Sequence, residues 1–520
     1  MNYLLSLIKI YKRCVKTPEF TVKVLDISSH TRGVILNYKD AKSMGVRTHD
    51  RVKVTYKEST LVCWVDTTNT FISPGNIGVF RNVADELGLE TGVTVNVDIS
   101  PPPISSDYVK KKMDGKALTK EEIYAIVNDI VNGNLTQLEI AAFAIAEKYL
   151  GMTLEETEYL TRAIADTGEK ITFDEPVFDK HSIGGVPGNK VTLLIVPIIA
   201  AAGLLIPKTS SRAITSPSGT ADTMEVLAPV EIEASELKRI ATKTRGAIVW
   251  GGALNIAPAD DLIIQVEYPL SLDPHSQIMA SIYAKKLAVG ANFLVLDIPV
   301  GPGTKMPTME AGRKFAREFV ALGERLGIEV ECGITYGGQP VGHAIGPALE
   351  AKEALMALMG KGPNSLIEKS TALAGILLEM GGVAQRGLGK DMAKEILFSG
   401  KALKKMREII AEQGGDPNIK PDDLPIGDKS VTIPAPADGY IASVNNTIIK
   451  KIARIAGAPV DKGAGVLLYG KVGYKVKRGD PLFTIYAEKE AKLNAAHTLA
   501  ITKPPITVEG MLLQRISSIS

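Results

Sequence analysis

Between residues 177 and about 420, short runs of apolar residues alternate with stretches of helical periodicity. The apolar runs occupy residues 204–207, 247–250, 293–300 and 328–334. Strands that are apolar along their whole length are typical of parallel sheets, because helices bury such sheets on both faces. The sequence therefore predicts a mainly parallel α/β domain over residues 177–420. In such a fold, ligands bind beyond the carboxyl ends of the strands.

The residues before this region have two other patterns. Residues 20–99 alternate between polar and apolar side chains in several short stretches, which indicates short strands and a β-rich domain. A Pro-rich segment at residues 101–106 then breaks regular structure. In residues 107–172, a Thr repeatedly precedes Glu or Gln and an apolar helical run, which is typical of helix starts. We expect a helical domain here, which later helices join.

The two ends of the chain complete the predicted organisation. Residues 428–520 return to short strands and predict a small C-terminal α+β domain, whereas residues 1–19 form an extension of unknown role. The fold class is therefore multidomain α/β, with a β-rich N-terminal domain, a helical domain, a mainly parallel central domain and a small α+β domain. A length of 520 residues suits this division, because a single core stops growing beyond about 250–300 residues.

Composition excludes several classes of function. Lys and Arg number 60 against 58 Asp and Glu, so the net charge of +2 gives no indication of a nucleic-acid partner. The longest mainly apolar run, residues 191–206, is shorter than the roughly 20 residues of a membrane helix and predicts a buried core segment. The three cysteines lie far apart, and His275 and His343 have no partners at ligand spacing. We therefore expect no metal site, no membrane partner and a reducing, cytoplasmic setting.

Loops rich in Gly and hydroxyl residues follow the apolar runs. Residues 208–227 contain eight Ser and Thr residues, and Gly-rich loops occur at residues 180–190, 251–254, 301–306 and 335–342. Backbone N–H groups and hydroxyls in such loops bind anions, although one Gly-rich turn alone is more often only a tight turn. Neither a nucleotide-triphosphatase loop nor a dinucleotide fingerprint is complete here. Taken together, the loops favour free phosphate or a monophosphate.

Four motifs resemble the thymidine phosphorylase family of nucleoside phosphorylases. They begin at Lys180, Ser211, Ser281 and Gly338 and read Lys-His-Ser-x-Gly-Gly, Ser-Arg-Ala-x-x-x-Pro-Ser-Gly-Thr-x-Asp-x-x-Glu, Ser-Ile-Tyr-Ala-Lys-Lys-Leu and Gly-Gln-Pro-Val-Gly-His-Ala-Ile-Gly. The resemblance is ordered and covers about residues 107–500. The additional domain at residues 20–99 makes the chain similar to the archaeal AMP phosphorylases within that family.

This resemblance implies a pentosyltransferase that converts AMP and phosphate into adenine and ribose 1,5-bisphosphate in nucleotide degradation, with CMP and UMP as further substrates. It implies inorganic phosphate as co-substrate, no cofactor, and a homo-oligomer of dimers. By family position, Asp273 is the proton donor, and Lys180 and Ser182 contact phosphate. The residues implied to bind AMP are Gly185, Ser211, Arg212, Ala213, Ile214, Thr215, Ser216, Thr220, Ser281 and Lys305.

Three of these residues, Asp273, Arg212 and Lys305, also have a simpler interpretation. Adenine leaves poorly as an anion, so an acid is needed, and a carboxyl that stays protonated near neutral pH requires burial. Asp273 lies just before a helical stretch, where Asp is often an N-cap instead. Arg212 either makes a bidentate contact with phosphate through its guanidinium group, or forms an ion pair with Asp222 or Glu225 that holds the loop. Lys305 either meets a phosphate or is a solvated loop lysine.

Three other functions stay open. A pyrimidine-nucleoside phosphorylase, such as one for thymidine or uridine, would place an Arg shortly before the helix that carries Ser281, and residues 262–272 contain none. A phosphoribosyltransferase would need magnesium and carboxylates for a diphosphate. A non-catalytic carrier or assembly protein is the third: residues 479–486 resemble strand ends of biotinyl or lipoyl modules without their attachment turn, and residues 40–54 resemble half of a double-psi barrel.

Overall fold

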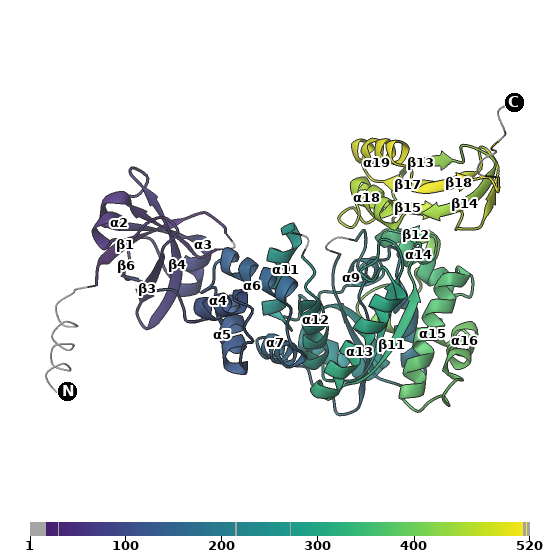
Figure 1. The fold of residues 1–520 in the computed structure, drawn as a ribbon, viewed down its shortest axis with the longest axis horizontal. Coiled ribbons are helices and arrows are strands. Elements are labelled where there is room, and N and C mark those ends of the chain that lie inside the picture. The colour runs from purple at the N-terminus through teal and green to yellow at the C-terminus, as the bar shows by residue number, and fades with distance from the viewer. Residues whose placement is uncertain (1–16, 30, 214–215, 271, 513–515, 517–520) are drawn as a thin grey trace. The chain divides into compact units, whose positions relative to one another are not determined.

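The structure of the protein is a computed structural model that describes residues 17–29, 31–213, 216–270, 272–512 and 516. The chain forms two compact units, one up to Ala146 and the other from Glu147 onward. Figure 1 shows the elements of both units, which are described here one after the other.

The first unit contains a closed barrel of six strands in the order β1-β5-β2-β4-β3-β6. The strands are β1 (Glu19–Leu25), β2 (Gly33–Asn37), β3 (Arg51–Tyr56), β4 (Ser59–Thr68), β5 (Asn76–Phe80) and β6 (Thr94–Ile99). β1 pairs in parallel with β5, and β2 with β4, whereas the other neighbours are antiparallel. Alternate side chains such as Val52 and Val54 are buried in the barrel core, as the period-two pattern predicts.

Two short helices occupy corresponding places in the barrel. α2 (Tyr38–Met44) follows β2, and α3 (Arg81–Leu87) follows β5. Each ends at a glycine in the left-handed conformation, Gly45 with φ 73° and Gly88 with φ 65°. Glycine adopts this conformation without steric cost, so it ends each helix.

Four helices follow the barrel along the chain. They are α4 (Ser105–Met113), α5 (Lys120–Val131), α6 (Gln137–Leu150) and α7 (Leu154–Asp166), and α6 runs across the boundary between the units. Thr119, Thr136 and Thr153 precede α5, α6 and α7. Each hydroxyl accepts a hydrogen bond from the N–H of a Glu three residues on, and that Glu carboxylate accepts one from the Thr N–H. These reciprocal bonds confirm the predicted helix starts.

Parallel strands lie at the centre of the second unit. β7 (Val177–Ser182), β10 (Ala291–Val300) and β11 (Glu329–Tyr336) form one sheet in the order β11-β10-β7. β8 (Ile206–Ser210) pairs in parallel with β9 (Gly246–Trp250), and a parallel bridge from Val177 to Leu205 connects the two pieces. The predicted apolar runs overlap β8, β9, β10 and β11. The sequence does not predict β7, because its buried residues include Asp179 and Lys180.

Helices pack on both faces of this sheet (Figure 1). α13 (Met309–Leu326) lies on one side of β11, and α15 (Asn364–Met380) lies on the other. α8 (Thr192–Ala201) is buried along almost its whole length, as predicted for residues 191–206. The remaining helices of this region are α9 (Thr220–Met224), α10 (Ala234–Thr244), α11 (Pro258–Leu270), α12 (His275–Ala288), α14 (Pro347–Leu358), α16 (Gly389–Phe398) and α17 (Lys401–Glu412).

The C-terminal segment adds two small sheets, in the orders β12-β15-β17-β13 and β16-β14-β18. Their elements, with two helices, are β12 (Ala344–Ile345), β13 (Lys429–Pro434), β14 (Gly439–Val444), α18 (Asn446–Ala456), β15 (Gly465–Leu468), β16 (Lys475–Val476), β17 (Pro481–Ala487), α19 (Glu490–Thr502) and β18 (Ile506–Glu509). The structure confirms the predicted fold class: it contains a barrel, a helical region, a parallel sheet with helices on both faces, and a C-terminal α+β segment. Among the described residues, no helix is long and apolar enough to cross a bilayer.

Candidate active site

The loops after β7 and β10 meet at the carboxyl edge of the sheet, where this type of fold binds ligands. Gly185 has a φ of 95°, and a Cβ atom there would lie 2.9 Å from the backbone nitrogen of Lys305. The two loops approach this closely because residue 185 is a glycine. The structure therefore brings together two predicted site residues that lie far apart in the sequence.

Two neighbouring cavities open at this edge. The larger has a volume of about 600 Å³, and its lining includes the predicted residues Ser211, Asp273, Ser281 and Lys305. The smaller has a volume of about 240 Å³, and its lining includes the predicted residues Lys180, Ser182, Gly185, Ser211, Arg212, Ser216 and Thr220. Ala213 lines a third cavity, and Ile214 and Thr215 lie outside the described residues. Because Ser211 and His181 line both of the first two cavities, these two adjoin.

Buried lysines give the smaller cavity a positive character. Lys180 and Lys208 line it, and Asp179 forms ion pairs with Lys286 and, at 3.3 Å, with Lys208. Burial lowers the pKa of Lys180 to about 8 and that of Lys208 well below its ordinary value. Burial alone would raise the pKa of Asp179, but Lys208 and Lys286 hold it below its ordinary value. A bound anion such as phosphate would favour the charged form of these lysines, so the smaller cavity is suited to an anion.

Asp297 on β10 positions polar groups at the edge of the smaller cavity. Its buried carboxylate accepts hydrogen bonds from Ser182 Oγ at 2.8 Å, Asn189 Nδ2 at 2.9 Å and Thr335 Oγ1 at 2.6 Å. Lys369 Nζ lies 2.9 Å from it. The predicted phosphate contact Ser182 is thus held in one orientation by a carboxylate that the sequence motifs did not single out.

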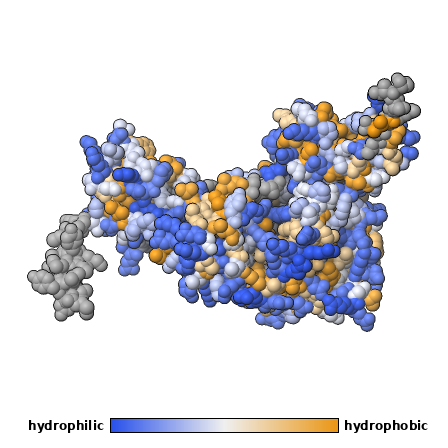
Figure 2. Space-filling view, viewed as in Figure 1, coloured by the Kyte–Doolittle hydropathy of each residue, from blue (hydrophilic) through white to orange (hydrophobic). Residues whose placement is uncertain are grey.

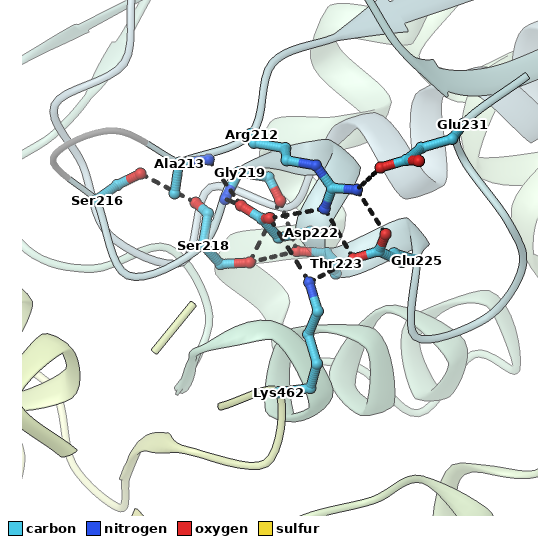
Figure 3. A network of polar contacts seen from close by, with 10 residues as sticks. All are labelled: Arg212, Ala213, Ser216, Ser218, Gly219, Asp222, Thr223, Glu225, Glu231 and Lys462. Atoms are coloured by element: carbon cyan, nitrogen blue, oxygen red, sulfur yellow. Dashed lines mark hydrogen bonds and ion pairs between the residues drawn. The ribbon is translucent and has the colours of Figure 1, made fainter. Parts of the chain in front are cut away.

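The guanidinium of Arg212 is engaged in ion pairs (Figure 3). It donates to both carboxylate oxygens of Glu225, at 2.7 and 2.6 Å, and to Glu231 at 2.9 Å. Its carbon atom Cζ lies 4.7 Å from the ring centroid of Trp250. The hydrogen bonds from Arg212 lower the pKa of Glu225 to about 2. Of the two interpretations of Arg212, this geometry supports the ion pair that holds the loop.

The buried side chain of Asp222 fixes the hydroxyl-rich loop, which follows β8, through hydrogen bonds to its backbone (Figure 3). It is 3% exposed, and its Oδ2 atom accepts hydrogen bonds from the backbone N–H groups of Ala213 at 2.7 Å and Gly219 at 2.9 Å. A Cβ atom at Gly219 would lie 2.6 Å from the carbonyl oxygen of Ser211, so this turn needs glycine. One carboxylate thereby fixes both ends of the loop that lines the smaller cavity.

A lysine from the C-terminal segment completes this network. Lys462, in the loop after α18, lies 2.5 Å from a Glu225 carboxylate oxygen and 3.6 Å from Asp222 Oδ1. Figure 3 shows its side chain reaching these two carboxylates from the opposite side to Arg212. No sequence pattern identifies Lys462, because its partners lie far away along the chain.

Asp273 and Lys305 form an ion pair in the larger cavity, with Lys305 Nζ 2.6 Å from Asp273 Oδ1. The N-cap interpretation of Asp273 is wrong, because α12 begins at His275 and Pro274 is its N-cap. The expected burial of Asp273 is also wrong, since its side chain is 56% exposed. Lys305 is accordingly paired with a carboxylate rather than solvated alone, and both groups face the space that a ligand would enter.

Ser281 and Lys285 share one face of α12, as their spacing predicts. Ser281 Oγ donates to the buried Asp260 at 2.8 Å, and Lys285 Nζ donates to the same carboxylate oxygen at 2.5 Å. Asp260 thus positions both polar groups at the larger cavity. In the described part of the chain, no group of three or more His, Cys, Asp or Glu side chains is arranged to hold a metal ion.

Comparison with known families matches three parts of the chain. Residues 106–168 match the helical bundle domain of the glycosyl transferase family, residues 174–403 match its a/b domain, and residues 440–506 match the pyrimidine nucleoside phosphorylase C-terminal domain. Among solved structures, an anthranilate phosphoribosyltransferase from Thermus thermophilus has a TM-score of 0.51 at 20% identity, covering 59% of this chain and 99% of that chain. This likeness concerns the fold alone.

Curated relatives match the chain over nearly its whole length. The AMP phosphorylase of Methanococcoides burtonii is 54% identical over 96% of this chain and 99% of its own. That of Methanosarcina acetivorans is 55% identical over 95% and 98%, and that of Thermococcus kodakarensis is 54% identical over 96% and 99%. The similarity includes the N-terminal barrel and both cavities.

Proposed function

The chain belongs to the AMP phosphorylase family, and we propose on this basis that it cleaves AMP with inorganic phosphate, giving adenine and ribose 1,5-bisphosphate. Near full-length identity of about 54% to enzymes of that name is the observation that carries the proposal. The match to the glycosyl transferase family identifies the chain as a pentosyltransferase-type enzyme. Two adjoining cavities support the proposal. The smaller one, which buried lysines line, suits phosphate, and the larger one, which Asp273 lines, suits the nucleotide.

We place phosphate in the smaller cavity. Lys180 supplies positive charge, and hydroxyl groups come from Ser182 and from the loop that Asp222 holds in place. These groups neutralise the charge of phosphate and hold it beside the anomeric carbon of the nucleotide. No cofactor is required by this scheme, because phosphate itself is the second substrate.

We place the ribose and base in the larger cavity, where Ser281 and Asp273 face the nucleotide. As the glycosidic bond breaks, the sugar becomes cation-like and the base takes up the bonding electrons. Asp273 gives the base nitrogen a proton, so that adenine leaves as a neutral molecule. Lys305 is paired with Asp273 in this structure, and it exchanges this partner for a phosphate oxygen when the nucleotide binds.

CMP and UMP are proposed as further substrates. The segment before the helix that carries Ser281 contains no arginine between residues 262 and 272, so a cationic side chain does not select a pyrimidine there. A substrate panel tests the proposal: the protein is incubated with phosphate and AMP, CMP, UMP, thymidine or uridine, and the released base and sugar phosphate are identified. AMP should have the highest kcat/KM, and a higher value for thymidine or uridine would contradict the assignment.

We also propose that the protein is a homo-oligomer of dimers. α6 exposes Leu138, Tyr149 and Leu150 to 80%, 76% and 53%, and Figure 2 shows hydrophobic residues on the visible face over this helix. Apolar side chains gathered on one helix are typical of a surface that another subunit covers. Light scattering should give a particle mass that is an even multiple of the chain mass, and a monomer mass would contradict the proposal.

A further inference from the structure

Glu267 is a buried carboxyl in the larger cavity that the proposed mechanism does not yet use. It lies near the end of α11, is 7% exposed, and lines the cavity together with Asp273 and Lys305. Its Oε1 atom has no hydrogen-bond partner among the described residues. A carboxylate anion in this position would lose its water without gaining donors, so the site favours the protonated, neutral carboxyl group.

The charged groups around Glu267 act in the same direction. Glu147 on α6, Asp260 on α11 and Asp273 before α12 face it with negative charge, and Lys305 after β10 opposes them. Burial, followed by these three carboxylates, raises the pKa of Glu267 to about 8. At neutral pH, Glu267 therefore holds a proton inside the cavity.

Asp273 is in a different environment. It is more than half exposed, and it accepts a hydrogen bond from the ammonium group of Lys305, which is the arrangement of a carboxylate anion. A carboxylate anion has no proton to donate. If Asp273 protonates the leaving base, it must first receive a proton from another group in each catalytic cycle.

We propose that Glu267 supplies this proton to Asp273, which then passes it to the leaving base. The inference rests on the proposed function, because it concerns the base-releasing step of that reaction. The O–H bond of Glu267 breaks and its proton passes to a water molecule in the shared cavity, which gives a proton to Asp273, so that a new O–H bond forms there. The glycosidic bond then breaks, its electron pair stays on the base nitrogen, and that nitrogen takes the proton from Asp273.

The remaining atoms and charges of the step also balance. A phosphate oxygen forms the new bond to the anomeric carbon, and the phosphate releases one proton to solvent. Glu267 regains its proton from solvent after the products leave. Glu267 is thus a positioning residue for the proton, since it acts through Asp273 rather than on the nucleotide itself.

The pH dependence of kcat tests this role, measured with AMP at saturating phosphate so that the bound anion keeps Lys180 charged. Wild-type kcat should fall as pH rises through about 8, because Glu267 then loses its proton. Glu267→Gln keeps the shape but has no transferable proton, so kcat should fall by roughly 100-fold, within the range of general acid–base catalysis. The decline of kcat near pH 8 should disappear in this variant. Glu267→Asp should restore part of the lost kcat and part of its pH dependence.

A surface variant and a direct measurement separate this role from a structural one. Glu310→Gln removes an exposed carboxyl group outside the cavities and should leave the wild-type profile unchanged. Infrared spectroscopy near neutral pH should show a stronger C=O stretching band of protonated carboxyl groups in the wild type than in a folded Glu267→Gln protein, because Glu350 contributes to this band in both. Identical spectra for the two proteins in this region would overturn the inference independently of activity.

A double variant tests whether Glu267 acts through Asp273. The residual rate of Asp273→Asn should not fall further when Glu267→Gln is added, since the two changes block one route. A further fall, or a Glu267→Gln profile equal to that of the wild type, would overturn the relay. A wild-type protein that fails to phosphorolyse AMP would instead contradict the proposed function, so the two failures are distinguishable.

Discussion

Replacing Asp222 by Asn should weaken binding of phosphate-bearing substrates by loosening the hydroxyl-rich loop. Asp222 Oδ2 accepts hydrogen bonds from two backbone N–H groups, at 2.7 and 2.9 Å. A hydrogen bond to a charged group contributes about 1.5–3 kcal/mol, and one between neutral groups contributes about 1 kcal/mol. Asn keeps the neutral acceptor oxygen but loses the charge, so the held conformation of the loop loses about 2 kcal/mol. The equilibrium constant that favours this conformation then falls roughly 30-fold.

Two measurements check this expectation. Initial rates of adenine release should give a KM for phosphate, for AMP or for both that is up to about 30-fold higher in Asp222→Asn, with a smaller change in kcat. Hydrogen exchange at Ala213 and Gly219, whose N–H groups bind Asp222, should become faster. As a control, Glu236→Gln removes a carboxylate from an exposed ion pair with Arg239. It should change neither the KM values nor the hydrogen-exchange rates. Unaltered KM values together with unaltered exchange in Asp222→Asn would refute the reasoning.

Two other predictions follow from the cavities. Asp273→Asn should reduce turnover of AMP to a small residual rate but leave AMP binding largely intact in calorimetry, because it removes the proton donor and keeps the shape. Near wild-type turnover would contradict its role. Burial lowers the pKa of Lys180 to about 8, so Lys180 loses its charge above that pH and the KM for phosphate should rise there. Lys180→Met should raise this KM already at neutral pH and remove its pH dependence, and a pH-independent KM in the wild type would disprove the assignment.

Local signals in the sequence predicted much of the fold. The reciprocal Thr and Glu capping pairs marked the starts of α5 and α7, and the continuous apolar runs marked β9 and β10. Capping pairs and apolar runs depend on residues close together in the chain, so the sequence alone predicts them. β7 was not predicted because Asp179 and Lys180 interrupt its apolar character, and only the partner lysines from distant segments make their burial possible.

The candidate site was predicted in part for the same reason. Motifs pointed to Lys180 and the loop after β8, and the family resemblance implied Asp273. The structure places all three around two adjoining cavities. Asp297 and Lys462 carry no motif, because their contacts come from segments far away along the chain. The sequence also did not show that Glu267 is buried and Asp273 is exposed, because the burial of one carboxyl group depends on tertiary packing.

Phosphorolysis of AMP is the central claim, and labelled phosphate tests it most directly. The protein is incubated with AMP and ¹⁸O-phosphate, and the sugar product is analysed by mass spectrometry. We expect adenine and ribose 1,5-bisphosphate in equal amounts, with the label in the phosphate on the anomeric carbon. Unlabelled ribose 5-phosphate would indicate hydrolysis instead, and no release of adenine would contradict the assignment altogether.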